Sequence, residues 1–312
     1  MSAYFVRRLW QTIPTFAGVL LLVFVLFRVW GGDPAVVLGG LGASPQQIDA
    51  IRQQLGLERP WPEQFARFTW QALTFDWGRS WATNEPVAQL LATRLPATLT
   101  VMLPIVVLET LLALPLAMWT AHRRGRASDR LLTACTTVAL SISFLVVIVV
   151  GQYLFAFRLG WFPVQGWSES VADNLVRYAP LPVLLAVLVG LAAQSRLYRS
   201  VVLEELEQDH VRTARAKGLG EARVMLRHVL PNVLIPVLTN VGQQLPSAFV
   251  GSFLIEVYFS IPGIGREVLL AVNRSDFPVI QAVTVNLAAL TMLVNLATDF
   301  AYALVDPRVV LR

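Results

Sequence analysis

Few side chains in this sequence could carry catalysis or bind a metal, and their spacing fits neither task. The only lysine, Lys217, lies between Ala216 and Gly218, whereas a loop that cradles nucleotide phosphates needs glycine before the lysine and serine or threonine after it. One cysteine, Cys135, cannot form an intrachain disulfide. The HExxH and GxSxG motifs do not occur. The three histidines, too, lack metal-ligand spacing: His122, His210 and His228. We therefore expect no catalytic site and no resident cofactor or metal.

Three carboxylates fall within long apolar runs: Glu109, Glu256 and Asp299. A charged side chain at the centre of a bilayer costs about 2.5–3.5 kcal/mol on insertion scales, so such groups face a bundle interior or water. Two explanations stay open: Glu109 and Asp299 line a path and meet a substrate's ammonium group, or each pairs with an arginine or hydroxyl on a neighbouring helix. Other polar residues in the apolar runs are further candidates for the same path: Asn240, Gln243, Gln244, Asn286 and Asn295.

Long apolar runs must position these residues. The chain has 312 residues, of which 55% are hydrophobic and only 14% charged. About 20 apolar residues in a helix match the roughly 30 Å hydrocarbon core of a bilayer. The first such run, Trp10 to Trp30, has a tryptophan for each interface and no small-residue cleavage site, so we interpret it as a retained span and not a signal peptide. Five further spans are predicted, at 97–121, 131–157, 178–197, 229–256 and 279–305.

Loop charges set the expected orientation. The segments on the side of Arg7 and Arg8 sum to about +8 and those on the other side to about −1, as the positive-inside rule requires. The same rule explains the net charge of +5 without nucleic acid. We therefore predict an all-α membrane protein with six transmembrane helices and both termini cytoplasmic. Its parts are the N-terminus and first span (1–30), an external helical segment (31–96), a core of five spans (97–305) and a cytoplasmic C-terminal tail (306–312).

Two helices are expected in the external segment. Ser44 and Gln47 form a capping box before a helix that Gly56 ends. A second amphipathic helix is predicted near 62–73, with Phe65, Phe68 and Ala72 on one side.

The fifth span is interrupted by prolines and glycines. Such breaks persist in a membrane only where neighbouring helices or water satisfy the freed backbone groups. The span therefore either bends along a path or is a kinked packing helix, and the residues responsible are Pro231, Pro236, Gly242, Pro246 and Gly251.

A short basic segment, "RTARAKGLGEARVMLRHVLPN" at 212–232, separates two apolar runs on the predicted cytoplasmic side. A helix over 209–220 places Val211, Ala214, Arg215 and Gly218 on one face, a stripe of short side chains edged by a cation. Small residues let another backbone approach closely, and cations pair with carboxylates. We interpret the segment as a docking helix for a protein partner. The alternative, a helix lying on anionic headgroups, would carry Trp, Phe or Leu on its apolar face.

At this segment the sequence resembles the permease subunits of ABC importers, specifically the dipeptide, oligopeptide and nickel branch. The signature pattern of that family is EAA-xxx-G-x9-I-x-LP, and Ala214, Gly218, Leu230 and Pro231 match it, while "RTARAKGL" is similar to the form of the peptide branch. Further similar stretches follow in order along nearly the whole chain: "RRLWQTIP", "GDPA", "QQLGLERP", "RLPATL", "LGWFPVQG", "FSIPGIGREV", "DFPVIQ" and "DPR". "SISF" at 141–144 departs from the family, which commonly has a proline there, so we expect a straighter start to the third span.

The resemblance implies a mechanism and a set of partners. In such importers a loop helix between spans four and five, here within about 198–230, docks in a cleft of a cytoplasmic ATPase, whose ATP-driven closure moves it. The implied partners are a second homologous permease, two ATPase subunits that hold ATP and magnesium, an external solute-binding protein and the bacterial inner membrane. The implied cargo is di- or oligopeptides, with nickel chelates or another small solute as alternatives. The alternative function is that of an ion-coupled secondary transporter. The implied coupling residues are Arg212, Thr213, Ala214, Arg215, Lys217, Gly218, Leu230 and Pro231.

Overall fold

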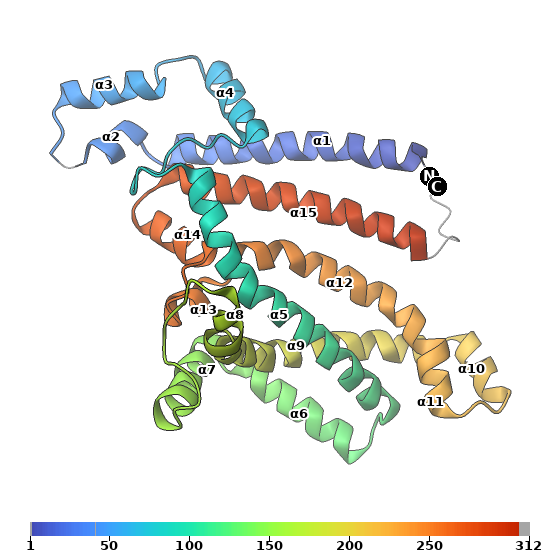
Figure 1. Ribbon diagram of the computed structural model, residues 1–312. Helices are drawn as coiled ribbons and strands as arrows, with labels where there is room; N and C mark the ends of the chain where they lie inside the picture. The colour runs from blue at the N-terminus through green and yellow to red at the C-terminus, as the bar shows by residue number, and fades with distance from the viewer. Residues whose placement is uncertain (1, 41, 306–312) are drawn as a thin grey trace.

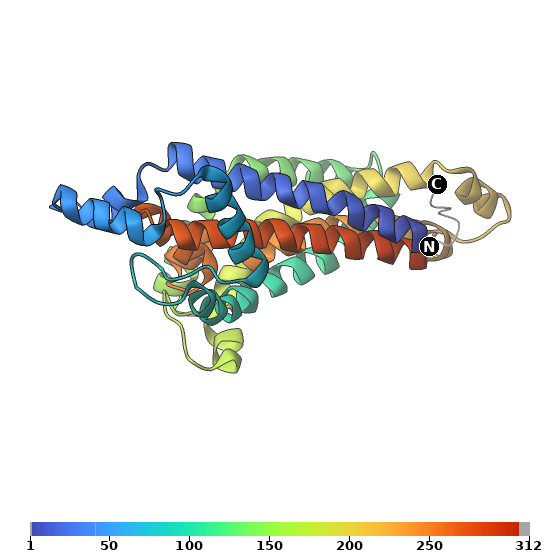
Figure 2. The same cartoon turned by 90° about the horizontal axis from the view of Figure 1, so that it is seen from above.

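Long helices form a bundle with two distinct ends (Figures 1 and 2). A computed structural model describes residues 2–40 and 42–305, and the side-chain surroundings of residues 10–29, 31–40 and 42–298. The N-terminal end of α1 and the C-terminal end of α15 lie at the same end of the bundle as α10, and α2, α3, α13 and α14 lie at the other. The long helices are α1 (Ser2–Val25), α5 (Val87–His122), α9 (Pro180–Leu206), α12 (Leu230–Val250) and α15 (Phe277–Val305).

Five stretches of the described helices are long and apolar enough to cross a membrane. A bent helix pair, Ala127–Ser141 with Phe144–Arg158, supplies a sixth if it counts as one span. The all-α membrane fold predicted from the sequence is therefore confirmed, while the side on which each end lies stays a prediction. The five stretches are Trp10–Val29, Val87–His122, Pro180–Leu206, Glu221–Tyr258 and Phe277–Thr298.

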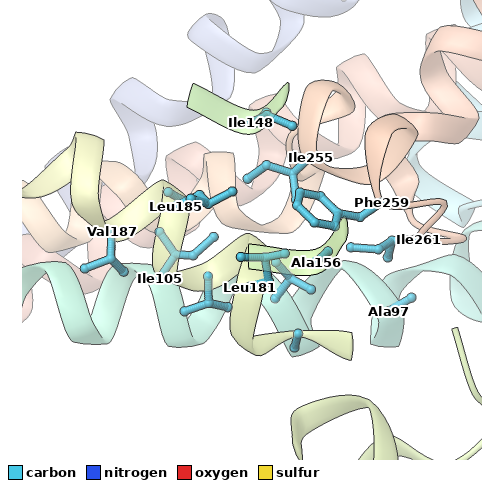
Figure 3. Close-up of a cluster of buried hydrophobic side chains, with 14 residues drawn as sticks. Ala97, Ile105, Ile148, Ala156, Leu181, Leu185, Val187, Ile255, Phe259 and Ile261 are labelled. Atoms are coloured by element: carbon cyan, nitrogen blue, oxygen red, sulfur yellow. The ribbon is translucent and has the colours of Figure 1, made fainter. Parts of the chain in front are cut away.

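The third predicted span is sharply bent, so the expectation of a straight start at 141–144 was wrong. Helix α6 (Ala127–Ser141) and helix α7 (Phe144–Gly151) meet at 92°. Ile142 and Ser143 adopt extended backbone with ψ of 130° and 134°, so the break needs no proline. Tertiary packing explains the new direction, because Ile148 of α7 enters a buried cluster with Leu185 of α9 and Ile255 (Figure 3).

Three other spans begin or end at different residues from those predicted. The fourth, predicted to end at 197, continues as α9 to Leu206. Helix α5 begins at Val87 and not near residue 97, because Pro96 lies inside the helix and does not terminate it. Helix α12 ends at Val250 and not at 256, because Gly251 takes a φ of 80° that breaks the helix. The chain then forms α13 (Phe253–Tyr258) and α14 (Ile264–Asn273) before α15.

The external segment contains α2 (Pro34–Gly39), α3 (Pro45–Leu55) and α4 (Trp61–Thr74). The predicted capping box is confirmed: the Ser44 side chain accepts from the Gln47 backbone N–H, and the Ser44 backbone N–H donates to the Gln47 side chain at 2.9 Å. The predicted face of α4 is also confirmed, since Phe68 and Ala72 are buried, and Phe65 packs edge-on against Phe24 of α1 with ring centroids 5.5 Å apart.

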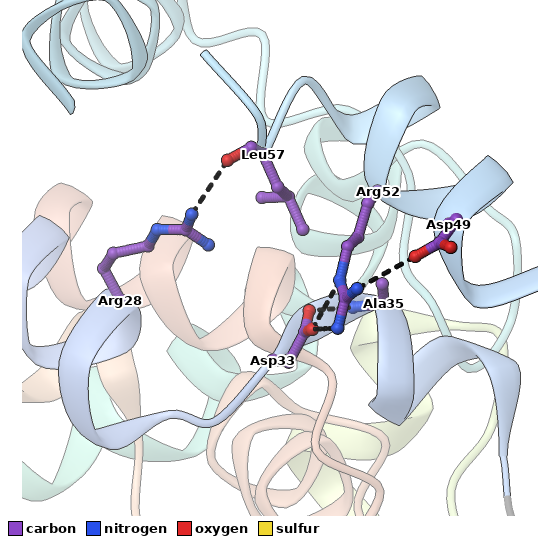
Figure 4. A network of polar contacts seen from close by, with 6 residues as sticks. All are labelled: Arg28, Asp33, Ala35, Asp49, Arg52 and Leu57. Carbon is purple, nitrogen blue, oxygen red and sulfur yellow. Dashed lines mark hydrogen bonds and ion pairs between the residues drawn. The ribbon is translucent and has the colours of Figure 1, made fainter. Parts of the chain in front are cut away.

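One ion pair fixes the first two of these helices. The Arg52 Nε atom of α3 donates to Asp33 Oδ2, just before α2, at 2.8 Å (Figure 4). The remaining elements are short: α8 (Val171–Asp173), α10 (Asp209–Ala216), α11 (Glu221–Val224), and the π-helical segments η1 (Leu26–Trp30), η2 (Gln152–Arg158), η3 (Asn174–Tyr178) and η4 (Met225–Val229).

Candidate functional site

Helix α10 occupies the segment in which the docking helix was predicted. It ends at Ala216, a turn earlier than the predicted end at residue 220. The Gly218 backbone N–H donates to the Arg215 carbonyl at 2.9 Å, and Gly218 has a φ of 77°. A side chain on residue 218 would meet no atom within 4 Å, so the glycine is required by its backbone angle and not by crowding.

Two of the four residues of the predicted stripe, Val211 and Ala214, face the chain itself, so they cannot form the partner-facing surface. Val211 is fully buried and Ala214 is 4% exposed. Both belong to a buried cluster that includes Tyr198 and Val202 of α9 and Val224 of α11. Helical periodicity predicted which residues share a face, but only the contacts of the folded chain decide which face is covered.

The exposed side of α10 is cationic. Arg212, Thr213, Lys217 and Gly218 are all exposed, and so is Arg215. Arg215 donates from Nε to Glu221 Oε1 of α11 at 2.8 Å, and Glu221 Oε2 lies 3.9 Å from His122 Nδ1 at the end of α5. Arg212 pairs with Asp209 at 3.5 Å, and Lys217 has no ion pair within the part of the chain that the structure describes. This face can pair with carboxylates of another protein.

Helix α10 belongs to a buried cluster that it shares with three long helices. The cluster that buries it contains Ala113, Ala117 and Ala121, which follow one another at four-residue spacing on α5, and Val233 and Val237 of α12. Two polar links add to this packing. One joins Arg124 of the α5–α6 loop to Glu207 after α9 at 3.1 Å.

The second polar link connects α9 with α12 beside α10. Glu205 of α9 contacts His210 Nε2 at 2.9 Å and accepts from Asn232 Nδ2 of α12 at 2.6 Å. Leu230 is partly buried at the start of α12, and Pro231 is exposed in its first turn, directly after the π-helical segment η4. A displacement of α10 would therefore move the ends of α5, α9 and α12 together.

Glu109 lies in the contact between α5 and α9. It is 8% exposed, and a side chain added at Gly190 of α9 would come within 1.8 Å of its Oε1 atom. The sequence suggested an arginine or a hydroxyl on a neighbouring helix as the partner of Glu109. Among the described residues, no such group makes a hydrogen bond or ion pair with Glu109. Asp299 lies outside the residues whose side chains are described, so its proposed role stays a prediction.

The other path candidates do not converge on one site in this chain. Asn240 of α12 accepts from the Tyr198 hydroxyl at 3.1 Å and from Gln244 at 2.6 Å, which places it between α9 and α12. Gln243 is exposed on the same helix. Asn286 of α15 lines an otherwise apolar cavity of about 180 Å³ between α5, α12 and α15. Asn295 is exposed.

Glu256 has a role that the sequence did not reveal. It is 1% exposed, and it accepts from Thr98 Oγ1 of α5 at 2.9 Å and from the Arg266 backbone N–H of α14 at 2.7 Å. Thr98 in turn accepts from the Ile264 N–H at 2.8 Å. An added side chain at any of three neighbouring glycines would come within about 3 Å of the Glu256 carboxyl group: Gly251, Gly263 and Gly265. The only signal in the sequence was this glycine-rich stretch around an acid.

Asp276 is a second buried carboxylate, and it accepts hydrogen bonds from the loop before α5. It is 2% exposed and accepts from the Ser80 hydroxyl at 2.5 Å and from the backbone N–H groups of Trp81 and Ala82 at 3.0 and 3.2 Å. This carboxylate ties the external segment to the start of α15. Nothing in the pattern of residues around Asp276 predicted the contact, because its partners are nearly two hundred residues away in the chain.

Comparison with known proteins covers the whole chain. The family of binding-protein-dependent transport system inner membrane components matches residues 113–311, and the N-terminal family of the same membrane components matches residues 1–102. A protein of Sinorhizobium fredii named a probable peptide ABC transporter permease is 35% identical over 99% of both chains. The di/tripeptide transport system permease protein of Pseudomonas aeruginosa is 34% identical over 99% of both chains.

The break between the two family matches falls within α5. The N-terminal match contains α1, the external helices and the first part of α5, and the second match contains the remaining spans with α10 between them. The chain therefore belongs to the family of binding-protein-dependent transport system inner membrane components, the non-catalytic permease subunits of ABC transporters.

Proposed function

We propose that this permease forms half of the translocation path of an importer for di- or oligopeptides. The proposal rests on the relatives of this chain. Proteins that are about one third identical to it over nearly the full length are named peptide or di/tripeptide permeases. Binding-protein-dependent transport implies a binding protein and an ATPase subunit that binds the ATP. The further arrangement that we propose is a second homologous permease and two ATPase subunits around one path.

The cargo is tested through the binding protein. The permease is purified with its native partners, and the copurified binding protein is titrated with dipeptides, with an oligopeptide and with a nickel chelate. Saturable binding of a peptide, with uptake of the same peptide by the reconstituted importer, supports the proposal. Binding of the nickel chelate without any peptide binding would replace peptides as the cargo while leaving the permease assignment intact.

The exposed basic side of α10 is the proposed contact with the ATPase. Arg212, Lys217 and Gly218 present this surface, while Ala214 contributes by holding the helix against its own chain. A partner that carries acidic groups in a cleft would match the exposed cations. Movement of the ATPase would then reach the spans through the buried contacts of α10 with α5, α9 and α12.

Replacing Gly218 with tryptophan tests this contact. The Cβ of a side chain at residue 218 would meet no atom within 4 Å, although tryptophan is strained at a φ of 77°. We expect Gly218→Trp to be inserted in the membrane, to lose ATPase association and to abolish transport. Gly160→Trp is the matched control, because Gly160 also has a positive φ, 64°, and open space around it, but lies in the external loop after η2. Copurification of the ATPase is the measurement. Normal ATPase association and uptake with Gly218→Trp would contradict the proposed contact.

The external helices α3 and α4 are the proposed contacts of the binding protein, whereas the "SIPGIG" segment at 260–265 is mostly buried and offers little surface. Helix α3 projects from the bundle at the end opposite α10 (Figure 1). The path itself is proposed to lie between this chain and the second permease. Its candidate lining residues remain Glu109, Asp299, Asn240, Gln243 and Asn286.

A further inference from the structure

A cavity at the external end of the bundle has the composition of an anion site. It has a volume of about 310 Å³ and lies between the end of α1, the helices α3 and α4, and the start of α15. We propose that it binds the phosphate of an anionic phospholipid at the outer surface of the membrane. This ligand is distinct from the transported cargo.

Positive charge in the cavity exceeds negative charge. Four arginines line it, Arg28, Arg59, Arg67 and Arg79, and among the described lining residues the only carboxylate is Glu63. Glu63 pairs with Arg59 at 2.5 Å. The other three arginines have no carboxylate partner in the described structure.

None of those three arginines forms an ion pair in the described structure, although the charge of Arg28 also acts on the nearby Asp33. Arg28 donates to the Leu57 carbonyl at 3.0 Å (Figure 4), and Arg79 donates to the Asn84 carbonyl at 2.6 Å. Carbonyl acceptors satisfy hydrogen bonds but do not neutralise a guanidinium. Arg67 is exposed and makes no hydrogen bond or ion pair within the described residues. Arginine suits phosphate because its planar fork presents two N–H groups to two phosphate oxygens.

A buried donor in the cavity wall also lacks an acceptor. Trp77 lines the cavity and is 8% exposed, and its indole Nε1 has no hydrogen-bond partner in the described structure. Its ring is held edge-on against Phe68, with centroids 6.2 Å apart. A buried donor left without an acceptor is destabilising, so an acceptor oxygen in the cavity would be favoured.

The surroundings of the cavity favour a lipid over a free anion. Arg28 lies at the end of the candidate span Trp10–Val29, at the level where a membrane surface is expected. Trp81 in the cavity wall packs against Phe277 of α15 with centroids 5.3 Å apart, and tryptophan is enriched at such interfaces. Helix α4 and its end also expose large apolar side chains: Trp70 at 67%, Leu73 at 58% and Phe75 at 62%. A small soluble anion needs none of this apolar surface, whereas acyl chains would cover it.

Lipid titration of the full-length chain in detergent tests the proposal. Native mass spectrometry measures retention of phosphatidylglycerol and phosphatidylcholine by the wild-type chain and by Arg67→Gln, Trp77→Phe and Arg274→Gln. Arg274 is the matched control, an exposed arginine outside the cavity at the same end of the bundle. Trp77→Phe keeps an aromatic ring and removes the N–H donor.

We expect wild-type chain to prefer phosphatidylglycerol and Arg67→Gln to lose about tenfold in that affinity, the usual effect of one hydrogen bond to a charged group. Trp77→Phe should weaken retention as well, and Arg274→Gln should leave it unchanged. Equal retention of the two lipids, or equal losses in Arg67→Gln and Arg274→Gln, would overturn the proposal. Displacement of phosphatidylglycerol by millimolar inorganic phosphate would overturn the lipid as ligand and assign the site to a free anion. Arg67 is exposed, so its variant remains a test even if Trp77→Phe fails to fold.

Discussion

Two buried carboxylates at the end of the bundle opposite α10 are satisfied by hydroxyl and backbone donors from distant parts of the chain. Glu256 binds Thr98 and the backbone of α14, and Asp276 binds Ser80 and the two backbone amides that follow Ser80. Each is a single side chain that joins elements whose packing alone would leave their relative position loose. Removing one contact from a buried acceptor with several donors lowers the free energy of unfolding strongly, because the remaining groups stay desolvated.

Replacing Glu256 with glutamine should destabilise the permease. The new amide would place an N–H₂ group against either Thr98 or the Arg266 N–H, both of which need an acceptor. We expect a loss of about 1.5–3 kcal/mol in the free energy of unfolding, the range for hydrogen bonds to charged groups. The apparent melting temperature in detergent is the measurement. Glu169→Gln, at an exposed acid without such contacts, is the control, and equal melting temperatures for the two variants would contradict the role of Glu256.

At the scale of elements, the break between α6 and α7 and the packing of α10 both depend on contacts outside the element itself. The residues of α6 and α7 are apolar enough to form one span, yet Ile142 and Ser143 leave the helical region. Likewise, α10 would expose its small residues in isolation, but α9 and α11 cover them. In each case the local sequence permits more than one outcome, and burial of apolar surface selects one.

Proline should be tolerated at position 143. Ser143 already has a φ of −60°, the residue before it is extended, and the Ser143 N–H makes no hydrogen bond in the described part of the chain. We expect Ser143→Pro to keep or raise the melting temperature, corresponding to about 0.4–1 kcal/mol of stabilisation. Ala134→Pro, in the exposed middle of α6, should cost about 3 kcal/mol. A destabilising Ser143→Pro would show that the bend observed here is not the preferred conformation.

The ion pair between Arg52, in the last turn of α3, and Asp33, just before α2, should make the packing of these two helices sensitive to acid. Burial alone would raise the pKa of Asp33, but hydrogen bonds from Arg52 and from the Ala35 amide, together with the charges of Arg52 and Arg28, lower this pKa below its ordinary value. Because the pKa is lowered on folding, the stabilisation is present above the unfolded value of about 3.9 and is lost as pH falls through the folded pKa.

Hydrogen exchange of α3 between pH 6 and pH 3 measures this effect. We expect protection of α3 in the wild-type chain to decrease below about pH 4, beyond the intrinsic change in exchange rate. Asp33→Asn should show the weaker protection already at pH 6 and little further change. Identical pH profiles for the two chains would contradict a role for the Asp33 carboxylate.

At the scale of the whole molecule, the bundle separates two kinds of surface. One end carries the N-terminal end of α1, the C-terminal end of α15 and α10, and the other carries α2 and α3 (Figure 1). The exposed cations of α10 lie at the first end, and the arginine-lined cavity lies at the second. The permease family is a component of the inner membrane and works with proteins on both sides of it. This separation suits such a role, because an ATPase and a binding protein must reach opposite ends.

Thiol labelling of intact spheroplasts tests which end is external. Cys135 is first replaced by serine, and Gln46→Cys in α3 and Lys217→Cys after α10 are then introduced separately at exposed positions. We expect an impermeant maleimide to label Gln46→Cys directly and Lys217→Cys only after permeabilisation. The reverse pattern would contradict the orientation derived from loop charges.

Local rules were sufficient for the parts of the fold that depend on neighbouring residues. The capping box at Ser44, the glycine that ends α3 and the left-handed Gly218 after α10 follow from a few consecutive residues. The apolar runs likewise predicted the spans, because hydrocarbon thickness sets the length of a helix that crosses it. Among the proposed coupling residues, the cations of α10 are exposed as a docking surface requires, while Ala214 is not.

The sequence by itself determined that this is a helical membrane protein with one basic segment between two spans, because composition and helix-terminating signals act over a few turns. Only the tertiary structure decided which side of α10 is covered, where the third span bends, and that Glu256 holds a loop together. Those features depend on residues far apart in the chain, as with Thr98 and Glu256, and a periodic pattern along one helix carries no information about its neighbour. Packing and donor–acceptor matching between distant segments therefore settled what local chemistry left open.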